Sequence, residues 1–121
     1  MSEAEKDAVV FQQAGDVTVA AIQTPEITSK ASDMLEARLK EAGSSGQAVK
    51  FVLDLSSLDF LGSVGLSVLV VFLQRVRKSE GHLALAGLSG LCRDVMHVTG
   101  MERAFRMYDD VPKAVEALKR T

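Results

Sequence analysis

The sequence predicts a single α/β domain with a central, mixed and mostly parallel sheet of about five strands and about four helices. Segments rich in β-type residues alternate with amphipathic helical segments along the chain, as expected where helices connect parallel strands. The chain has 121 residues, of which 47% are hydrophobic, enough for one core but not for two domains. We expect residues 1–8 to form an N-terminal tail and residues 9–121 to form the domain.

The N-terminal part of the chain predicts a hairpin followed by a helix. Two runs of β-type residues, 9–13 and 17–23, flank a glycine–aspartate pair that is typical of a tight turn. Apolar residues at spacings of three and four then predict a helix over residues 31–42. Thr28 or Ser29 can cap the start of this helix.

The centre of the chain predicts a buried strand and a second helix. Residues 50–55 are β-type without polar alternation, as expected for a central strand covered on both faces. The helix should extend over about residues 64–78. Its expected core stripe consists of Leu66, Leu69, Val70, Leu73 and Val76. Val68 and Val71 fall outside this stripe, so either a neighbouring loop covers them or they form an exposed docking patch.

The C-terminal third predicts two further strands and two short helices. Residues 82–86 form a buried strand, and residues 104–108 form an edge strand. A helix over residues 91–98 lies between them. Its inward-facing residues are expected to be Leu91, Val95 and Val98. Asp109 or Asp110 can cap a last helix that has a proline in its first turn.

The composition excludes several classes of protein. The net charge is −2, with 14 basic and 16 acidic side chains mixed along the chain, so nucleic acid is not an expected partner. A single cysteine, Cys92, excludes an intramolecular disulfide and is typical of a reducing cytoplasm. The longest apolar run, residues 68–73, is far shorter than a membrane span, and the charged N-terminus lacks a signal-peptide core. We therefore expect a soluble cytoplasmic domain without membrane insertion.

Catalytic and metal-binding patterns are also missing from the sequence. His82 and His97 belong to different elements, and neither has a further ligand at metal-binding spacing. The glycines of residues 62–65 follow a strand, but the lysine of a nucleotide-binding loop is absent. We interpret Asp54 and Asp59 as turn-stabilising residues instead of a catalytic acid and base. The chain is therefore expected to be no enzyme and to need no cofactor or metal.

The most informative segment is residues 51–66, in which an apolar strand leads through a serine-rich turn into an apolar helix. This order places Ser63 at the start of the helix, where its hydroxyl is exposed. The free backbone N–H groups of a first helical turn favour an anion such as a phosphate beside them. Ser63 is therefore either an ordinary N-cap residue or the site of a charge switch.

The segments Asp54-Leu55-Ser56, Phe60-Leu61 and Ser63-Val64-Gly65-Leu66 resemble the central motif of the STAS domain, the fold of bacterial anti-sigma factor antagonists. That motif reads roughly D-L-S, followed by F-(M/L)-D-S-(S/T)-G-L-G. The resemblance extends from about Val9 to Leu118 and implies that Ser63 corresponds to the serine that a partner kinase phosphorylates. Two positions depart from the motif, because Gly62 replaces an acidic residue and Val64 replaces Ser or Thr.

The resemblance implies a non-enzymatic switch that captures an anti-sigma factor with serine kinase activity and is released by phosphorylation on Ser63. The residues expected to bind the partner are Gly62, Val64, Gly65, Ser67, Val68, Val71, Glu26 and Thr28. One alternative is a scaffold or adaptor, not phosphorylated, in a signalling or transport complex. Another is a domain that binds a small apolar or nucleotide ligand near Ser63. Nothing in the sequence indicates the oligomeric state.

Overall fold

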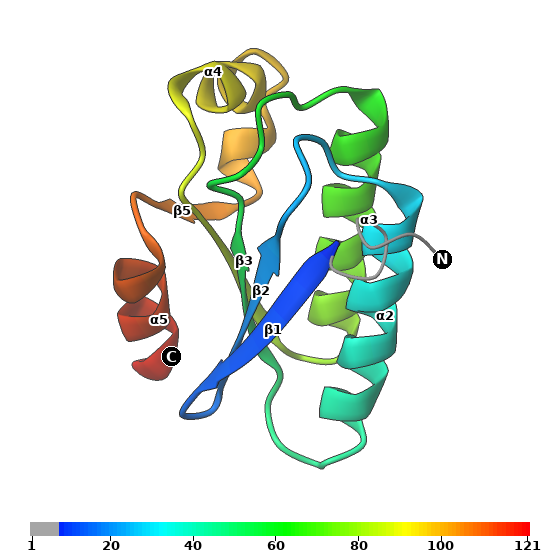
Figure 1. The fold of residues 1–121 in the computed structure, drawn as a ribbon. Helices are drawn as coiled ribbons and strands as arrows, with labels where there is room; N and C mark the ends of the chain where they lie inside the picture. Colours follow the sequence, from blue (N-terminus) through cyan, green and yellow to red (C-terminus); the bar gives the residue numbers. More distant parts are fainter. Residues whose placement is uncertain (1–7) are drawn as a thin grey trace.

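A five-stranded sheet forms the centre of the molecule (Figure 1). The computed structural model describes residues 8–121. The strands lie side by side in chain order, with β1 antiparallel to β2 and the remaining neighbours parallel. Their bounds are β1 Val9–Ala14, β2 Val17–Ile22, β3 Lys50–Asp54, β4 His82–Ala86 and β5 Arg106–Tyr108. The predicted mixed, mostly parallel sheet is confirmed.

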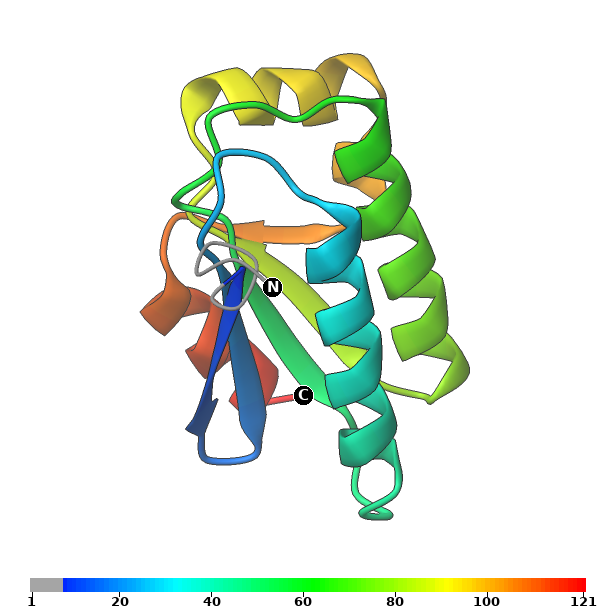
Figure 2. The same cartoon turned by 45° about the vertical axis from the view of Figure 1, so that its right-hand side comes forward.

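Helices cover both faces of this sheet. Helices α2 and α3 pack against one face and α5 against the other, while α4 lies across the end of the sheet that holds the carboxyl ends of β2 to β4 (Figures 1 and 2). The helices are α2 Ser29–Gly43, α3 Ser63–Lys78, α4 Gly90–Val98 and α5 Val111–Lys119, with a short 3₁₀ turn η1 at Met101–Arg103. The four α-helices of residues 8–121 agree with the expected number.

Alternate residues of the central strands supply two apolar cores. Phe51 and Leu53 of β3 belong to the core beneath α2 and α3, whereas Val52 belongs to the core beneath α5. All three side chains are fully buried. The ring of Phe51 packs edge-on against that of Phe72, with ring centroids 5.3 Å apart. Burial on both faces explains why β3 lacks polar alternation.

The prediction for the inner face of α4 is wrong for Leu91 and Val98, which are 64% and 83% exposed, and right for Val95, which is half-buried and packs against the core. The fully buried residues are Cys92 and Met96. The apolar residues of α4 occupy more than one face of the helix, so their spacing alone does not decide which face is buried. Cys92 and Met96, four residues apart, form the face that packs into the core. The hydroxyl of Ser89 caps the helix by accepting a hydrogen bond from the Cys92 N–H at 3.3 Å.

The first described residue, Ala8, is tied to the sheet. Residues 1–7 of the expected tail lie outside the described residues. Ala8 is buried, and its carbonyl accepts a hydrogen bond from the Gln23 N–H at 2.9 Å. Among residues 8–121, no helix has both the length and the apolar character needed to cross a bilayer.

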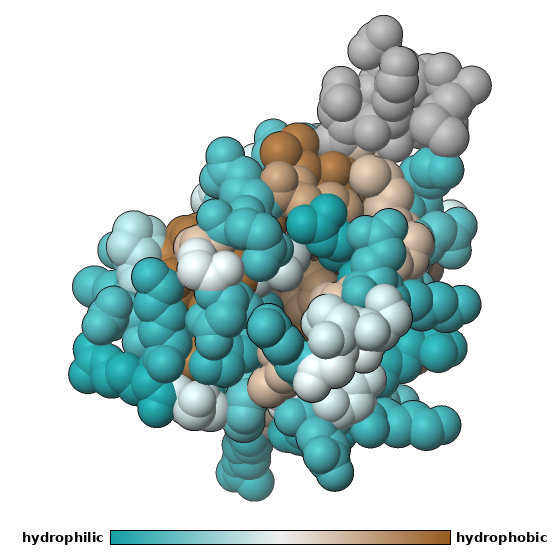
Figure 3. All heavy atoms as spheres, turned by 90° about the horizontal axis from the view of Figure 1, so that it is seen from below, coloured by the Kyte–Doolittle hydropathy of each residue, from teal (hydrophilic) through white to brown (hydrophobic). Residues whose placement is uncertain are grey.

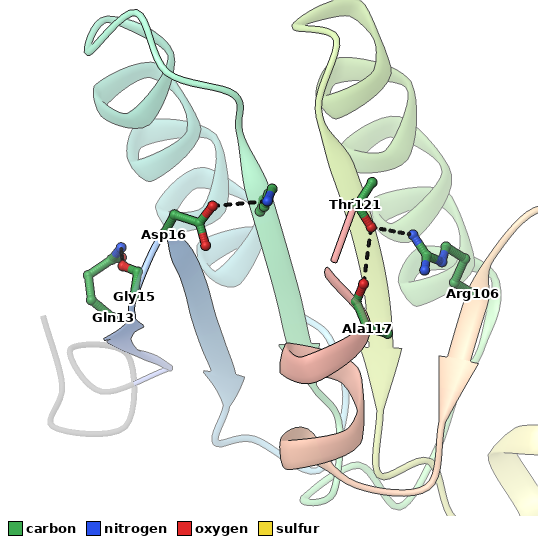
Figure 4. Close-up of polar contacts among 7 residues, drawn as sticks. Gln13, Gly15, Asp16, Arg106, Ala117 and Thr121 are labelled. Carbon is green, nitrogen blue, oxygen red and sulfur yellow. Dashed lines mark hydrogen bonds and ion pairs between the residues drawn. The ribbon is translucent and has the colours of Figure 1, made fainter. Parts of the chain in front are cut away.

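The end of the molecule that holds the β1–β2 turn and the α2–β3 loop has a mostly hydrophilic surface (Figure 3). One ion pair ties this end together. The buried ammonium group of Lys50, at the start of β3, donates to Asp16 Oδ2 in the β1–β2 turn at 2.9 Å (Figure 4). This bond holds the pKa of Asp16 below its ordinary value of 3.8.

We predict that Gly81→Ala destabilises the fold by about 2 kcal/mol, because overpacking typically costs that much. An added Cβ would lie 2.6 Å from the Val49 carbonyl oxygen and 3.1 Å from Val76 Cγ1. Urea unfolding of the variant measures the loss. The control is Gly90→Ala, where an added Cβ meets no atom within 4 Å. Equal stabilities of the two variants would contradict the packing argument.

We predict that Asp16→Asn destabilises the protein at neutral pH, because Lys50 then stays buried without its carboxylate. The folded-state pKa of Asp16 is lowered, so its stabilising effect is present above the unfolded pKa and is lost as the pH falls through the folded one. Urea unfolding between neutral pH and about pH 2.5 should show the difference from wild type shrinking at acidic pH. Asp33→Asn, an exposed carboxylate on α2, is the control.

Candidate functional site

The connection between β3 and α3 is fixed by short-range hydrogen bonds. Asp54 Oδ1 accepts from the Ser56 N–H at 3.1 Å, which confirms Asp54 as a turn-stabilising residue. The Leu58 N–H donates to the Leu55 carbonyl at 3.1 Å, closing the next turn. Leu58 and Leu61 are buried and anchor the connection to the core. The chain therefore enters α3 from a rigid segment.

A second connection is joined to the first through a single carbonyl. The carbonyl oxygen of Pro25, between β2 and α2, accepts hydrogen bonds from the N–H groups of Asp59 at 2.8 Å and Phe60 at 3.2 Å. These bonds hold the start of α2 beside the start of α3. Residues far apart in sequence, such as Glu26 and Ser63, consequently line the same hollow.

This hollow has a volume of about 370 Å³ and lies between the starts of the two helices. Six of the nine residues predicted for the site line it: Glu26, Thr28, Gly62, Ser63, Val64 and Gly65. Ile27 and Phe60 complete the lining. The remaining three predicted residues, Ser67, Val68 and Val71, lie further along α3 and do not contribute to the hollow.

Ser63 is the first residue of α3 and is exposed. The N-cap position belongs to Gly62, which has no side chain to bond the free N–H groups of the first turn. The interpretation of Ser63 as an N-cap is therefore wrong. The first helical hydrogen bond is donated by the Leu66 N–H to the Gly62 carbonyl at 2.9 Å. The N–H groups of the preceding residues thus lie before the helical ladder, beside the Ser63 hydroxyl.

The aromatic ring of Phe60 takes the space beside Gly62. A Cβ on Gly62 would lie 2.7 and 2.8 Å from two atoms of this ring. The ring itself is largely exposed and lines the hollow. Phe60 belongs to the family motif but was not predicted as a site residue, and neither was Ile27. For Phe60 the available signal was a bulky aromatic residue two positions before a glycine. Gly62, which replaces the acidic residue of the family motif, is therefore the residue against which the Phe60 ring packs.

The outward face of α3 carries an apolar stripe that begins next to Ser63. Val64 and Val71 are 62% and 39% exposed, and their spacing of seven residues places them on one face of the helix. Val68, between them, is half-buried and packs against the core. Of the two alternatives for these valines, exposure therefore applies to Val71 and not to Val68. Phe72 is buried, although it was not included in the predicted core stripe.

The other polar groups of the hollow suit binding. Thr28 caps α2, since its hydroxyl accepts from the Ala31 N–H at 3.2 Å. Glu26 supplies the one carboxylate of the lining. Within residues 8–121, His, Cys, Asp and Glu side chains form no group of three that could hold a metal ion. The site therefore combines an exposed hydroxyl, a helix N-terminus and apolar side chains.

Comparison with known proteins identifies the family. A family profile described as the STAS domain matches residues 8–114. BtrV of Bordetella bronchiseptica, named as a candidate anti-sigma factor antagonist, is 30% identical over 93 residues, which cover 77% of this chain and 79% of that protein. The chain belongs to the STAS domain family, among the anti-sigma factor antagonists. The resemblance inferred from the motif is thereby confirmed.

Solved structures share the fold. An anti-sigma factor antagonist from Mycobacterium paratuberculosis is 25% identical and matches with a TM-score of 0.72, covering 98% of this chain and 99% of that one. Bacillus SpoIIAA in its phosphorylated form matches with a TM-score of 0.66 at 19% identity, covering 93% of this chain and 98% of that one. The unphosphorylated form of SpoIIAA also gives a TM-score of 0.66. At this identity, the likeness to SpoIIAA shows the fold alone.

We predict that Ser63→Glu stabilises the protein by about 0.5 kcal/mol, because a negative charge interacts favourably with a helix N-terminus. Ser79→Glu, at the C-cap of the same helix, should destabilise it by a similar amount. Urea unfolding at low ionic strength measures both variants, and added salt should reduce the difference. Equal effects at the two ends would refute a helix-dipole contribution at Ser63.

Proposed function

We propose that this domain is a partner switch: it captures an anti-sigma factor that is also a serine kinase, and phosphorylation on Ser63 releases it. The observation that carries the proposal is the position of Ser63, exposed at the first residue of α3, beside a hollow and at the head of an apolar stripe. A hydroxyl in this position is open to a kinase without any unfolding of the domain.

A phosphate on Ser63 would change the surface more than the fold. It carries about −1.5 to −2 charges at neutral pH. The free N–H groups at the start of α3 can accommodate these charges, so the helix need not move. A hydrated dianion next to Val64 opposes burial of that side chain by a partner. A loss of about 3 kcal/mol in binding free energy is enough to weaken affinity by more than a hundredfold.

The comparisons support this view at the level of the fold. SpoIIAA has been solved with and without its phosphate, and both forms match the present chain equally well. A STAS domain of this shape can therefore carry a phosphate and keep its architecture. The name of BtrV supports an anti-sigma factor as the class of partner.

The partner is expected to lie along α3 from Ser63 towards its middle. Val64 and Val71 are about 10 Å apart along the helix, with exposed Ser67 between them. The half-buried Val68 packs against the core and exposes only part of its side chain to the partner. At Gly62 the kinase meets the ring of Phe60 where the family motif has an acidic residue.

The hollow favours a second candidate function, the binding of a small ligand near Ser63. Its volume of about 370 Å³ falls in the range of ligand pockets. Titration with nucleotides, followed by NMR, separates this candidate from the first. Saturable shifts at Phe60 and Ser63 would support a ligand, and unchanged spectra would leave the partner switch as the proposal.

We predict that wild-type protein, used as bait in its source cell, captures a serine kinase that Ser63→Glu fails to hold. A peptide map of the recovered wild-type protein should show phosphate on Ser63. Val64→Asp should also lose the kinase, because it places a charge in the proposed interface while remaining compatible with an exposed position.

Two controls accompany this experiment. Ser79→Glu adds the same charge at the opposite end of α3, outside the proposed interface, and Val98→Asp makes the matched valine change on α4. Retention of the kinase by Val98→Asp shows that added charge alone does not abolish capture. An unmodified Ser63, together with the same partners on wild type and Ser63→Glu, would refute the switch and favour a constitutive scaffold.

A further inference from the structure

A separate groove lies on the other side of the sheet, between the edge strand β5 and helix α5. It is a wide trough with a volume of about 760 Å³. None of its lining residues belongs to the hollow beside Ser63. Because α3 and α5 cover opposite faces of the sheet (Figure 1), this groove stays open when a partner lies along α3.

The charges that line the groove are mainly positive. Arg106, Lys113 and Arg120 supply three cations, and Glu116 supplies the one carboxylate. The only ion pair of Glu116 within residues 8–121 is with Arg120, at 3.5 Å between adjacent turns of α5. The groove is thus net positive in a chain whose net charge is −2.

Arg106 is held in place without a carboxylate partner among residues 8–121. Its guanidinium donates to the Tyr108 hydroxyl at 3.2 Å. It also donates to Thr121 Oγ1 at 3.4 Å (Figure 4). Thr121 Oγ1 in turn donates to the Ala117 carbonyl at 3.1 Å. Neutral hydroxyls orient the guanidinium but leave its charge uncompensated, and an oriented guanidinium is a strong donor to carboxylates.

Lys113 has only a weak intramolecular partner. Its ammonium group lies 3.6 Å from Asp109 Oδ2, whereas the other oxygen of Asp109 accepts from Arg93 at 2.7 Å. Asp109 is therefore engaged chiefly by Arg93. The ammonium group of Lys113 remains available to a second anion at the groove.

The shape of the groove favours an extended ligand. Tyr108, Pro112 and Ala117 contribute apolar surface between the cations. β5 is the last strand of the described sheet, so its outer edge has no neighbouring strand within residues 8–121. An extended segment can lie along such an edge and place alternate side chains against the groove.

We propose that the groove between β5 and α5 binds an acidic, extended peptide segment of a protein partner. Its carboxylates pair with Arg106, Lys113 and Arg120, and its intervening side chains contact Tyr108 and Pro112. This site is independent of the switch at Ser63, so one domain can hold two proteins at once.

The test uses a fluorescein-labelled synthetic peptide of nine residues that alternates Glu or Asp with Val or Leu. Fluorescence anisotropy should show saturable binding to wild type that weakens as salt is added. Arg106→Gln should weaken binding about tenfold, because it removes a charge-assisted contact. Lys113→Gln is a second variant, placed on a different element. The matched control Arg103→Gln, an exposed arginine on η1, should bind as wild type does.

NMR of the full chain locates the complex. The expected result is a set of peptide-induced shifts at residues 106–108 and along α5, with no shifts at Ser63. The proposal is overturned if the peptide does not bind, if its Gln and Asn analogue binds equally well, or if Arg103→Gln weakens binding as much as Arg106→Gln. Equal shifts caused by inorganic phosphate at the same concentration would also overturn it, because they indicate ordinary counterion binding. Neither the anisotropy nor the NMR experiment involves phosphorylation of Ser63, so the peptide proposal can be tested even if the switch proposal fails.

Discussion

The candidate site depends on one carbonyl group, that of Pro25. By accepting hydrogen bonds from two consecutive N–H groups, those of Asp59 and Phe60, it joins the β2–α2 and β3–α3 connections at the carboxyl edge of the parallel strands. Ligand sites of open α/β sheets form outside this edge, usually where neighbouring connections lead to opposite faces of the sheet. Here both connections lead to helices on the same face, and the joining carbonyl makes their N-termini converge. Together with the buried side chain of Ile27, which packs in the same core as α3, it places Glu26 and Thr28 near Ser63.

The two cores make the sheet a rigid support for this edge. Phe51 and Leu53 pack beneath α2 and α3 while Val52 packs beneath α5, so β3 is clamped from both sides immediately before the loop that leads to Ser63. The proposed switch needs this support, because a phosphate on Ser63 would have to change the surface that a partner contacts and not the position of the helix. The helix N-terminus serves the same end, since its N–H groups favour the new charge in place.

The sequence predicts the parts of this structure that follow from local pattern. The apolar run of β3, the spacing of α2 and the position of Ser63 at a helix start are all visible from residue types alone. The errors arise where distant residues decide. Cys92 and Met96 pack into the core and Leu91 and Val98 do not, because the elements packed against α4 decide which of its faces is covered. Val68 is half-buried for the same reason, since it packs against the core. The contact between Gly62 and Phe60 likewise depends on the Phe60 ring packing over the backbone of Gly62, which the spacing of residues in the sequence does not reveal. The convergence of Glu26 and Thr28 on Ser63 was predicted only through the family motif.

The contact between Phe60 and Gly62 has an evolutionary consequence. Gly62 has φ −102° and ψ −168°, an extended conformation that any residue adopts. The obstacle to a side chain there is the far end of an exposed ring, which can rotate into solvent. A lineage can therefore gain or lose an acidic residue beside Ser63 by a single codon change, without rebuilding the loop. Under the proposed function, duplicated copies of such a gene would diverge in kinase recognition at this one position, at almost no cost to folding.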